Sequence, residues 1–259
     1  MRIPLYQIDA FTSTLFSGNP AAVCPLEDWL EDGVLQAIAA ENNLSETAFF
    51  VQRGERYHLR WFTPTLEVDL CGHATLASAF VILNELEPSR DAVVFDTLSG
   101  ELRVSRDGGL LSMDFPARPP EPCEVPPKLV EALGRAPQAT LASRDLMAVF
   151  ATEDEVRSMA PKMAVLAEVD AFAVIVTAPG KEVDFVSRFF APRAGIDEDP
   201  VTGSAHSTLV PYWAKRLSRP TLHAWQVSPR GGELWCEDRG NRVIIKGNSV
   251  RYLEGVVEI

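Results

Sequence analysis

The sequence has few cysteines, and they form no metal-binding or disulfide pattern. The four, Cys24, Cys71, Cys123 and Cys236, are scattered through 259 residues without a CxxC pair. This spacing argues against both a zinc knuckle and a disulfide framework. Cys71 and His73 lie two residues apart, but the sequence offers no second pair of ligands to complete a site, so we predict no metal.

Long apolar runs, a signal peptide and basic stretches are also missing. No run approaches the roughly 18 apolar residues of a membrane-spanning helix, and the start, MRIPLYQIDAF, lacks a signal-peptide layout. The net charge is −12, and no segment is rich in lysine or arginine, which argues against nucleic acid and anionic membranes as partners. We expect a cytoplasmic protein that binds neither nucleic acid nor membrane.

Familiar cofactor and catalytic motifs are absent as well. No GxGxxG follows a predicted strand, and no GxxxxGK[ST], HExxH or GxSxG occurs. A nicotinamide, nucleotide, zinc-protease or serine-hydrolase function therefore lacks support, and we predict no cofactor.

The composition is that of a globular protein with a core, and the chain is long enough for one or two domains. Hydrophobic residues make up 46% and charged residues 23%. Residues 116–127 contain six prolines, a density that excludes a core helix or central strand and is typical of a linker. We predict two domains, 1–117 and 118–259, with the last strand a candidate for packing on the first half.

One motif occurs twice. The early copy, Arg60-Trp61-Phe62-Thr63-Pro64, is followed by an acidic segment and by Cys71-Gly72-His73-Ala74-Thr75. The late copy repeats this order, with Arg188-Phe189-Phe190-Ala191-Pro192, Asp197-Glu198-Asp199-Pro200 and Thr202-Gly203-Ser204-Ala205-His206. The chain therefore looks like a fused pair of related halves.

Each copy predicts a strand, an acidic turn and a helix that begins near the glycine. Apolar residues recur at helical spacing after Gly72 and after Gly203. A helix start offers unpaired N–H groups and a partial positive charge, and glycine lets a ligand approach closely. Two such starts suggest a cleft that holds one anionic substrate from both sides. The alternative, a duplication with merely capped helix starts, explains the repeated acid and aromatic residues less well.

The remaining chain predicts short strands with polar turns, and few helices. Strands are expected at residues 3–11, 21–25, 44–51 and 56–63, a helix at 31–42, a meander at 92–115, and further strands from residue 139 onward, with a helix start at 152–155. Each half is thus expected to be α+β, with mostly antiparallel strands around one long apolar helix.

Four side chains near these motifs can carry protons. Glu46, at the entrance of an apolar strand, is either a surface residue or a desolvated carboxylate, which burial would make a better base. His73 lies at the helix start, whereas His206 is expected to pack and Asp199 to serve in a turn or the site. Asn19, before a proline, fits a turn or a substrate contact equally. Such a cleft suits proton abstraction next to a carboxylate.

The motifs together resemble those of the phenazine-biosynthesis isomerase (PhzF) family. They are Gly18-Asn19-Pro20-Ala21-Ala22-Val23, Leu44-Ser45-Glu46-Thr47-Ala48-Phe49, Phe62-Thr63-Pro64, Cys71-Gly72-His73-Ala74-Thr75 and Asp199-Pro200-Val201-Thr202-Gly203-Ser204-Ala205. The resemblance implies a diaminopimelate epimerase-like fold of two barrel-like halves with the site between them, a homodimer, and no cofactor. It implies that Glu46 is the acid/base, that His73, Asp199 and Ser204 are polar site residues, and that Asn19, Gly72 and Gly203 hold the substrate carboxylate.

Two other functions stay open. Racemases of this fold use a cysteine before each glycine, and here the pair is Cys71 and Thr202, which resembles some hydroxyproline dehydratases. A non-catalytic interaction protein on the same scaffold is the third possibility, which the joint presence of Glu46, His73 and Asp199 disfavours. The sequence therefore predicts a cofactor-independent isomerase that moves a proton on a small carboxylate substrate.

Overall fold

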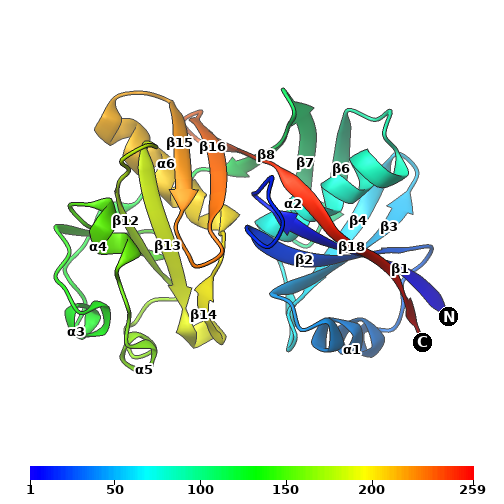
Figure 1. Ribbon diagram of the computed structural model, residues 1–259, viewed down its shortest axis with the longest axis horizontal. Coiled ribbons are helices and arrows are strands. Elements are labelled where there is room, and N and C mark those ends of the chain that lie inside the picture. The colour runs from blue at the N-terminus through cyan, green and yellow to red at the C-terminus, as the bar shows by residue number, and fades with distance from the viewer. The chain divides into compact units, whose positions relative to one another are not determined.

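The computed structural model describes residues 1–259 and divides into two compact units (Figure 1). The first unit comprises Met1–Asp114 and Lys246–Ile259, and the second comprises Phe115–Ile245. The C-terminal strand thus belongs to the first unit. No helix is long and apolar enough to cross a membrane.

The first unit is a sheet with one helix on each face. Strand β18 pairs with β1 and β1 with β2, both antiparallel, and the order continues through β3, β4, β6 and β7 to β8. The pairs β2–β3 and β4–β6 are parallel. The elements are β1 (Arg2–Ala10), β2 (Asn19–Leu26), α1 (Asp32–Asn42), β3 (Glu46–Arg53), β4 (Arg56–Phe62), β5 (Glu67–Val68), α2 (Gly72–Phe80), η1 (Val81–Leu86), β6 (Ala92–Thr97), β7 (Gly100–Asp107), β8 (Leu110–Pro116) and β18 (Ser249–Glu258).

The second unit repeats this pairing pattern. The order β10-β11-β12-β13-β15-β16 has parallel pairs at β11–β12 and β13–β15 and antiparallel pairs elsewhere. Its elements are β9 (Glu121–Pro122), α3 (Leu129–Leu133), β10 (Ala139–Ala142), β11 (Leu146–Val149), α4 (Glu153–Arg157), α5 (Met163–Leu166), β12 (Val174–Pro179), β13 (Phe185–Ala191), η2 (Pro192–Ala194), β14 (Ile196–Asp199), α6 (Gly203–Leu217), β15 (Thr221–Gln226), β16 (Gly232–Asp238) and β17 (Arg242–Gly247).

Helix α2 is buried because it packs on β1, β2 and β3 inside the first unit. Every residue from Gly72 to Ala79 is buried, and small side chains let the strands approach it. Helix α1 covers the other face, where Leu35 and Ile38 pack near Phe49. Since both faces are covered, β3 is buried continuously from Glu46 to Val51.

The first central helix changes its geometry partway. The sequence predicts one helix from Gly72 to about Glu85, but the α-helix ends at Phe80 and continues as the π-helix η1. The Glu87 N–H donates to the Ile82 carbonyl at 2.7 Å, which is the wide i to i−5 spacing. Apolar periodicity over so few residues does not distinguish the two geometries.

Two predicted irregular segments are more ordered than expected. The proline-rich segment lies in the second unit, where the Arg118 N–H donates to the Ser207 carbonyl at 2.8 Å and the Cys123 N–H to that of Thr140 at 3.0 Å. Its short strand β9 pairs on one side only, with β10, where proline is tolerated. The acidic segment after Phe190, predicted as a turn, forms strand β14 against β13.

Candidate active site

The repeated motif begins both central helices. Helix α2 starts at Gly72 after Cys71, and α6 starts at Gly203 after Thr202. Neither Cys71 nor Thr202 caps its helix with a side-chain hydrogen bond. The first N–H groups of each helix have no intrahelical partner.

In the first unit, four polar side chains gather at the start of α2. Glu46 is the first residue of β3 and Asn19 the first of β2, and these two strands are parallel neighbours. His73 Nε2 lies 3.0 Å from Glu46 Oε2, and His73 Nδ1 lies 3.0 Å from Asn19 Nδ2 and 3.6 Å from Cys71 Sγ. The structure thus brings together Asn19, Glu46 and His73, which are far apart in sequence.

The hydrogen bond from Asn19 fixes where the imidazole of His73 carries its proton. In the neutral ring, Nδ1 accepts from the Asn19 amide, which leaves the proton on Nε2, facing Glu46. The approach of Nε2 to Glu46 Oε2 is close enough for an ion pair but is not aligned as a hydrogen bond. These two buried atoms are therefore in reach of each other.

Burial and charge shift the pKa values of His73 and Cys71. Burial alone would lower the pKa of His73, but its interactions with Cys71 and Glu46 outweigh burial and raise that pKa well above its usual value. Burial, followed by the charge of Glu46, raises the pKa of Cys71 to about 11. Cys71 is consequently a thiol at neutral pH.

The same cluster supplies three potential metal ligands. One ligand atom each from Glu46, Cys71 and His73 lie within 4.8 Å of one another. The sequence spacing of Cys71 and His73 did not reveal this third group. Three protein ligands are one fewer than a structural zinc site has.

In the second unit, Asp199 and Thr202 are held by a glutamine that the sequence did not single out. The Thr202 hydroxyl donates to Asp199 Oδ2 at 2.5 Å. Gln226, buried on β15, accepts from the Thr202 N–H at 2.8 Å and donates to the Asp199 carbonyl at 2.8 Å. Only the fold brings Gln226 to this turn, since no motif links it to residue 199. Ser204 is half-buried in the first turn of α6.

His206 occupies the position in α6 that Thr75 occupies in α2. His206 Nδ1 donates to the Thr202 carbonyl at 2.9 Å, as the Thr75 hydroxyl donates to the Cys71 carbonyl at 2.5 Å. The imidazole lies against Phe185, with ring centroids 5.9 Å apart. Burial lowers the pKa of His206 to about 4, so this ring is neutral at physiological pH.

Comparison with known proteins places the chain in a family. The model of the phenazine biosynthesis-like (PhzC-PhzF) proteins matches residues 8–255. A Pseudomonas aeruginosa protein called an uncharacterized isomerase is 51% identical over the full length of both chains. A crystal structure of a PhzF-family protein of Enterococcus faecalis is 48% identical and superimposes with a TM-score of 0.98 over all of both chains.

The chain belongs to the PhzC-PhzF phenazine biosynthesis-like family, which confirms the resemblance of the motifs. A hydroxyproline epimerase of Agrobacterium vitis, 9% identical, shares the fold with a TM-score of 0.63, over 99% of this chain and 92% of its own. The predicted α+β fold of the epimerase type is therefore confirmed.

Proposed function

We propose that this protein is a cofactor-independent isomerase that moves a proton on a small carboxylate substrate. The observation that carries the proposal is the buried pair of Glu46 and His73, 3.0 Å apart at the start of α2. Glu46 is the acid/base in this proposal, and His73 and Asp199 assist it. A proton carrier next to the N–H groups of a helix start suits abstraction beside a carboxylate, because those groups stabilise the developing negative charge.

Binding of the substrate carboxylate is assigned to the residues that begin the two motifs. We propose that Asn19 and the N–H groups of Gly72, Gly203 and Ser204 hold it. Both glycines begin helices, and a helix start binds anions through its free N–H groups and its dipole. The protein is further proposed to be cytoplasmic and to form a homodimer. Light scattering of the purified protein tests the homodimer.

The state of Cys71 supports Glu46 over the thiol as the base. A racemase mechanism needs a thiolate, and the pKa of Cys71 is raised to about 11. Thr202, which precedes Gly203 as Cys71 precedes Gly72, donates a hydrogen bond to the Asp199 carboxylate. The observation that favours the alternative, a racemase or hydroxyproline dehydratase that uses Cys71 and Thr202, is that Cys71 lies 3.6 Å from His73 and can be deprotonated through it.

The decisive test is a carboxylate library followed by proton NMR in deuterated water. A substrate should isomerise and, unless its proton returns without exchange, take up deuterium. Glu46→Gln keeps the shape and removes the proton acceptor, so turnover should fall about a hundredfold to ten-thousandfold while binding persists.

Cys71→Ser is the matched control, and most of the turnover should survive in it. The reverse result, with turnover lost in the serine variant and kept in the glutamine variant, would replace this proposal with the racemase or dehydratase. If no library member reacts and none shifts the resonances of Gly72 and His73, the non-catalytic alternative holds. Dialysis against a chelator should leave turnover unchanged.

A further inference from the structure

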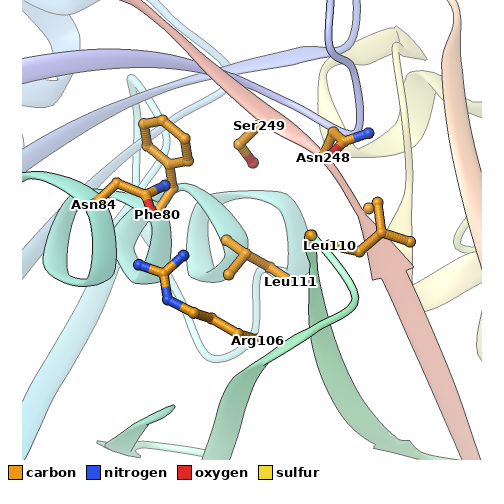
Figure 2. A pocket seen from close by; sticks show the side chains of 9 residues that line it. Phe80, Asn84, Arg106, Leu110, Leu111, Asn248 and Ser249 are labelled. Atoms are coloured by element: carbon orange, nitrogen blue, oxygen red, sulfur yellow. The ribbon is translucent and has the colours of Figure 1, made fainter. Parts of the chain in front are cut away.

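A second pocket opens in the first unit beside the π-helix. Its volume is about 150 Å³, and η1, the β7–β8 turn and the residues that lead into β18 enclose it (Figure 2). Phe80 and Leu111 form apolar walls, and Asn84, Arg106, Asn248 and Ser249 supply polar groups. None of these residues belongs to the cluster around His73.

The pocket has a positive charge that no carboxylate neutralises. Arg106 Nη2 donates to the Leu83 carbonyl at 2.5 Å and Nε to the Arg90 carbonyl at 3.3 Å. Two nearby acidic side chains are already paired, Asp107 with Lys246 at 2.5 Å and Glu85 with Arg251 at 2.7 Å. Asp91, whose carbonyl accepts from the Arg106 N–H at 2.9 Å, makes no ion pair with the guanidinium. The carbonyls anchor the guanidinium and leave Nη1 without a partner.

Two further polar groups in the pocket lack partners. Ser249 Oγ is buried and makes no hydrogen bond, which costs free energy unless a ligand or water satisfies it. The side-chain amide of Asn84, in η1, makes no hydrogen bond within the protein, and Figure 2 places it near the Arg106 guanidinium. π-helical segments occur frequently at functional sites.

We propose that this pocket binds a short 2-hydroxy carboxylate. The carboxylate pairs with Arg106 Nη1, since guanidinium groups match carboxylates in geometry and charge. The hydroxyl bonds to Ser249 Oγ, and the Asn84 amide offers a further donor. A cavity of about 150 Å³ accommodates roughly six non-hydrogen atoms, as benzene has, and lactate is of this size.

The probe is sodium lactate, titrated into the full-length protein and followed by proton–nitrogen NMR. The Asn84 side-chain amide and the backbone signals of Gly109 and Gly247 should shift in a saturable way. Lactamide, which is neutral and has nearly the same shape, should bind much more weakly. Shifts at Gly72 and His73 report the other site and are read separately.

Three variants decide whether the pocket chemistry is responsible. Arg106→Gln should weaken lactate binding about tenfold or more, the range for loss of a charged hydrogen bond. Arg103→Gln removes an equal charge from the same strand, outside the pocket, and should change little. Ser249→Ala should weaken binding a few-fold, and it leaves Arg106 in place should the glutamine variant fail to fold.

The proposal is overturned if wild-type protein shows no saturable shifts with millimolar lactate. It is equally overturned if lactamide binds as well as lactate, or if a folded Arg106→Gln protein binds lactate like the wild type. If Arg106→Gln and Arg103→Gln weaken binding equally, general charge attraction and not the pocket is responsible.

Discussion

The two units carry the same arginine clamp between the motif strand and its acidic segment. Arg60 forms two hydrogen bonds with Glu67, both at 2.7 Å, and its guanidinium lies 5.1 Å from the Phe62 ring. Arg188 forms the same pair with Glu198, at 2.7 and 2.8 Å, and lies 4.9 Å from the Phe190 ring. One acidic residue of each motif, Glu67 or Glu198, therefore has a structural role, which is to hold the acidic segment against the motif strand.

On this shared frame, the units differ in the groups suited to proton transfer. Phe62 pairs with Thr47 and Phe190 with Val174, so Ala173 takes the place of Glu46. Ser204 likewise takes the place of His73 in the motif. The duplication preserved the helix start twice, whereas a carboxylate and an imidazole are paired at the helix start in the first unit alone.

The largest difference in stability should appear when each clamp is broken in turn. Arg188 and Glu198 are 10% and 15% exposed, against 21% and 26% for Arg60 and Glu67, and Arg188 also donates to the Val156 and Met159 carbonyls. Arg188→Met leaves a buried carboxylate unpaired and should cost about 3–5 kcal/mol. Arg60→Met should cost about 1 kcal/mol.

Urea unfolding of both variants checks this prediction. Because the two units can unfold in separate steps, fluorescence and circular dichroism should be compared. Equal losses of unfolding free energy in the two variants would mean that burial does not determine how much each clamp stabilises the protein.

The next effect concerns His206, whose pKa is lowered to about 4 by burial. The folded state stays neutral while the unfolded chain takes up a proton near pH 6.5, so stability is lost as the pH falls. Between pH 6.5 and 4 this residue should remove about 3 kcal/mol from the free energy of unfolding. His206→Thr, which copies Thr75 of the first unit, should remove that part of the pH dependence.

Unfolding of the wild type and of the threonine variant at pH 6.5 and at pH 4 measures this pH dependence. The variant can be less stable throughout, because a ring is lost from the core. Only the difference between the two pH values tests the prediction, and an unchanged difference would falsify it.

His73 should titrate in the opposite sense. Its pKa is raised because its interactions with Cys71 and Glu46 outweigh burial. The stability that this pair contributes is present below pH 6.5 and is lost as the pH rises through the folded-state pKa. In Glu46→Gln the pKa of His73 should fall, whereas that of His206 should stay. NMR titration of the imidazole carbons follows both, and parallel movement of the two residues would argue against the local pair.

The sequence was a good guide to the frame because the motif recurs and each helix begins at its glycine. The strand at Glu46 and the helices at Gly72 and Gly203 followed from local patterns of apolar residues and turns. The register of β2 on β3, which brings Asn19 and Glu46 to the same end, involves pairing across intervening helix α1. No local pattern encodes such pairing.

Other parts of the site were beyond sequence reasoning for similar reasons. Gln226 reaches Asp199 and Thr202 only because β15 pairs in parallel with β13. The third ligand-type side chain beside Cys71 and His73 is Glu46, contributed by a separate strand. Spacing along the chain reports groups within one helix or turn, and these contacts join separate elements.

The smallest effect should come from Asp145, a buried acid of the second unit just before β11. By strand register, the corresponding residue of the first unit is Ala21. Asp145 is 2% exposed, and its Oδ1 makes no hydrogen bond. Burial raises its pKa, and the charges of Arg144 and Arg118 offset this only in part.

The fold therefore disfavours the ionised form of Asp145. This penalty is full above the folded-state pKa and disappears as the pH falls through it. Asp145→Asn should thus raise the melting temperature slightly at pH 7 and leave it unchanged in acid, where the wild-type carboxyl is itself neutral. Asp197→Asn, at an exposed acid of the same unit, is the matched control and should have no effect at either pH. A loss of stability at pH 7 in Asp145→Asn would instead mean that the ionised carboxylate is held by Arg118 and Arg144, and that the second unit keeps this acid as an anchor for its proline-rich segment.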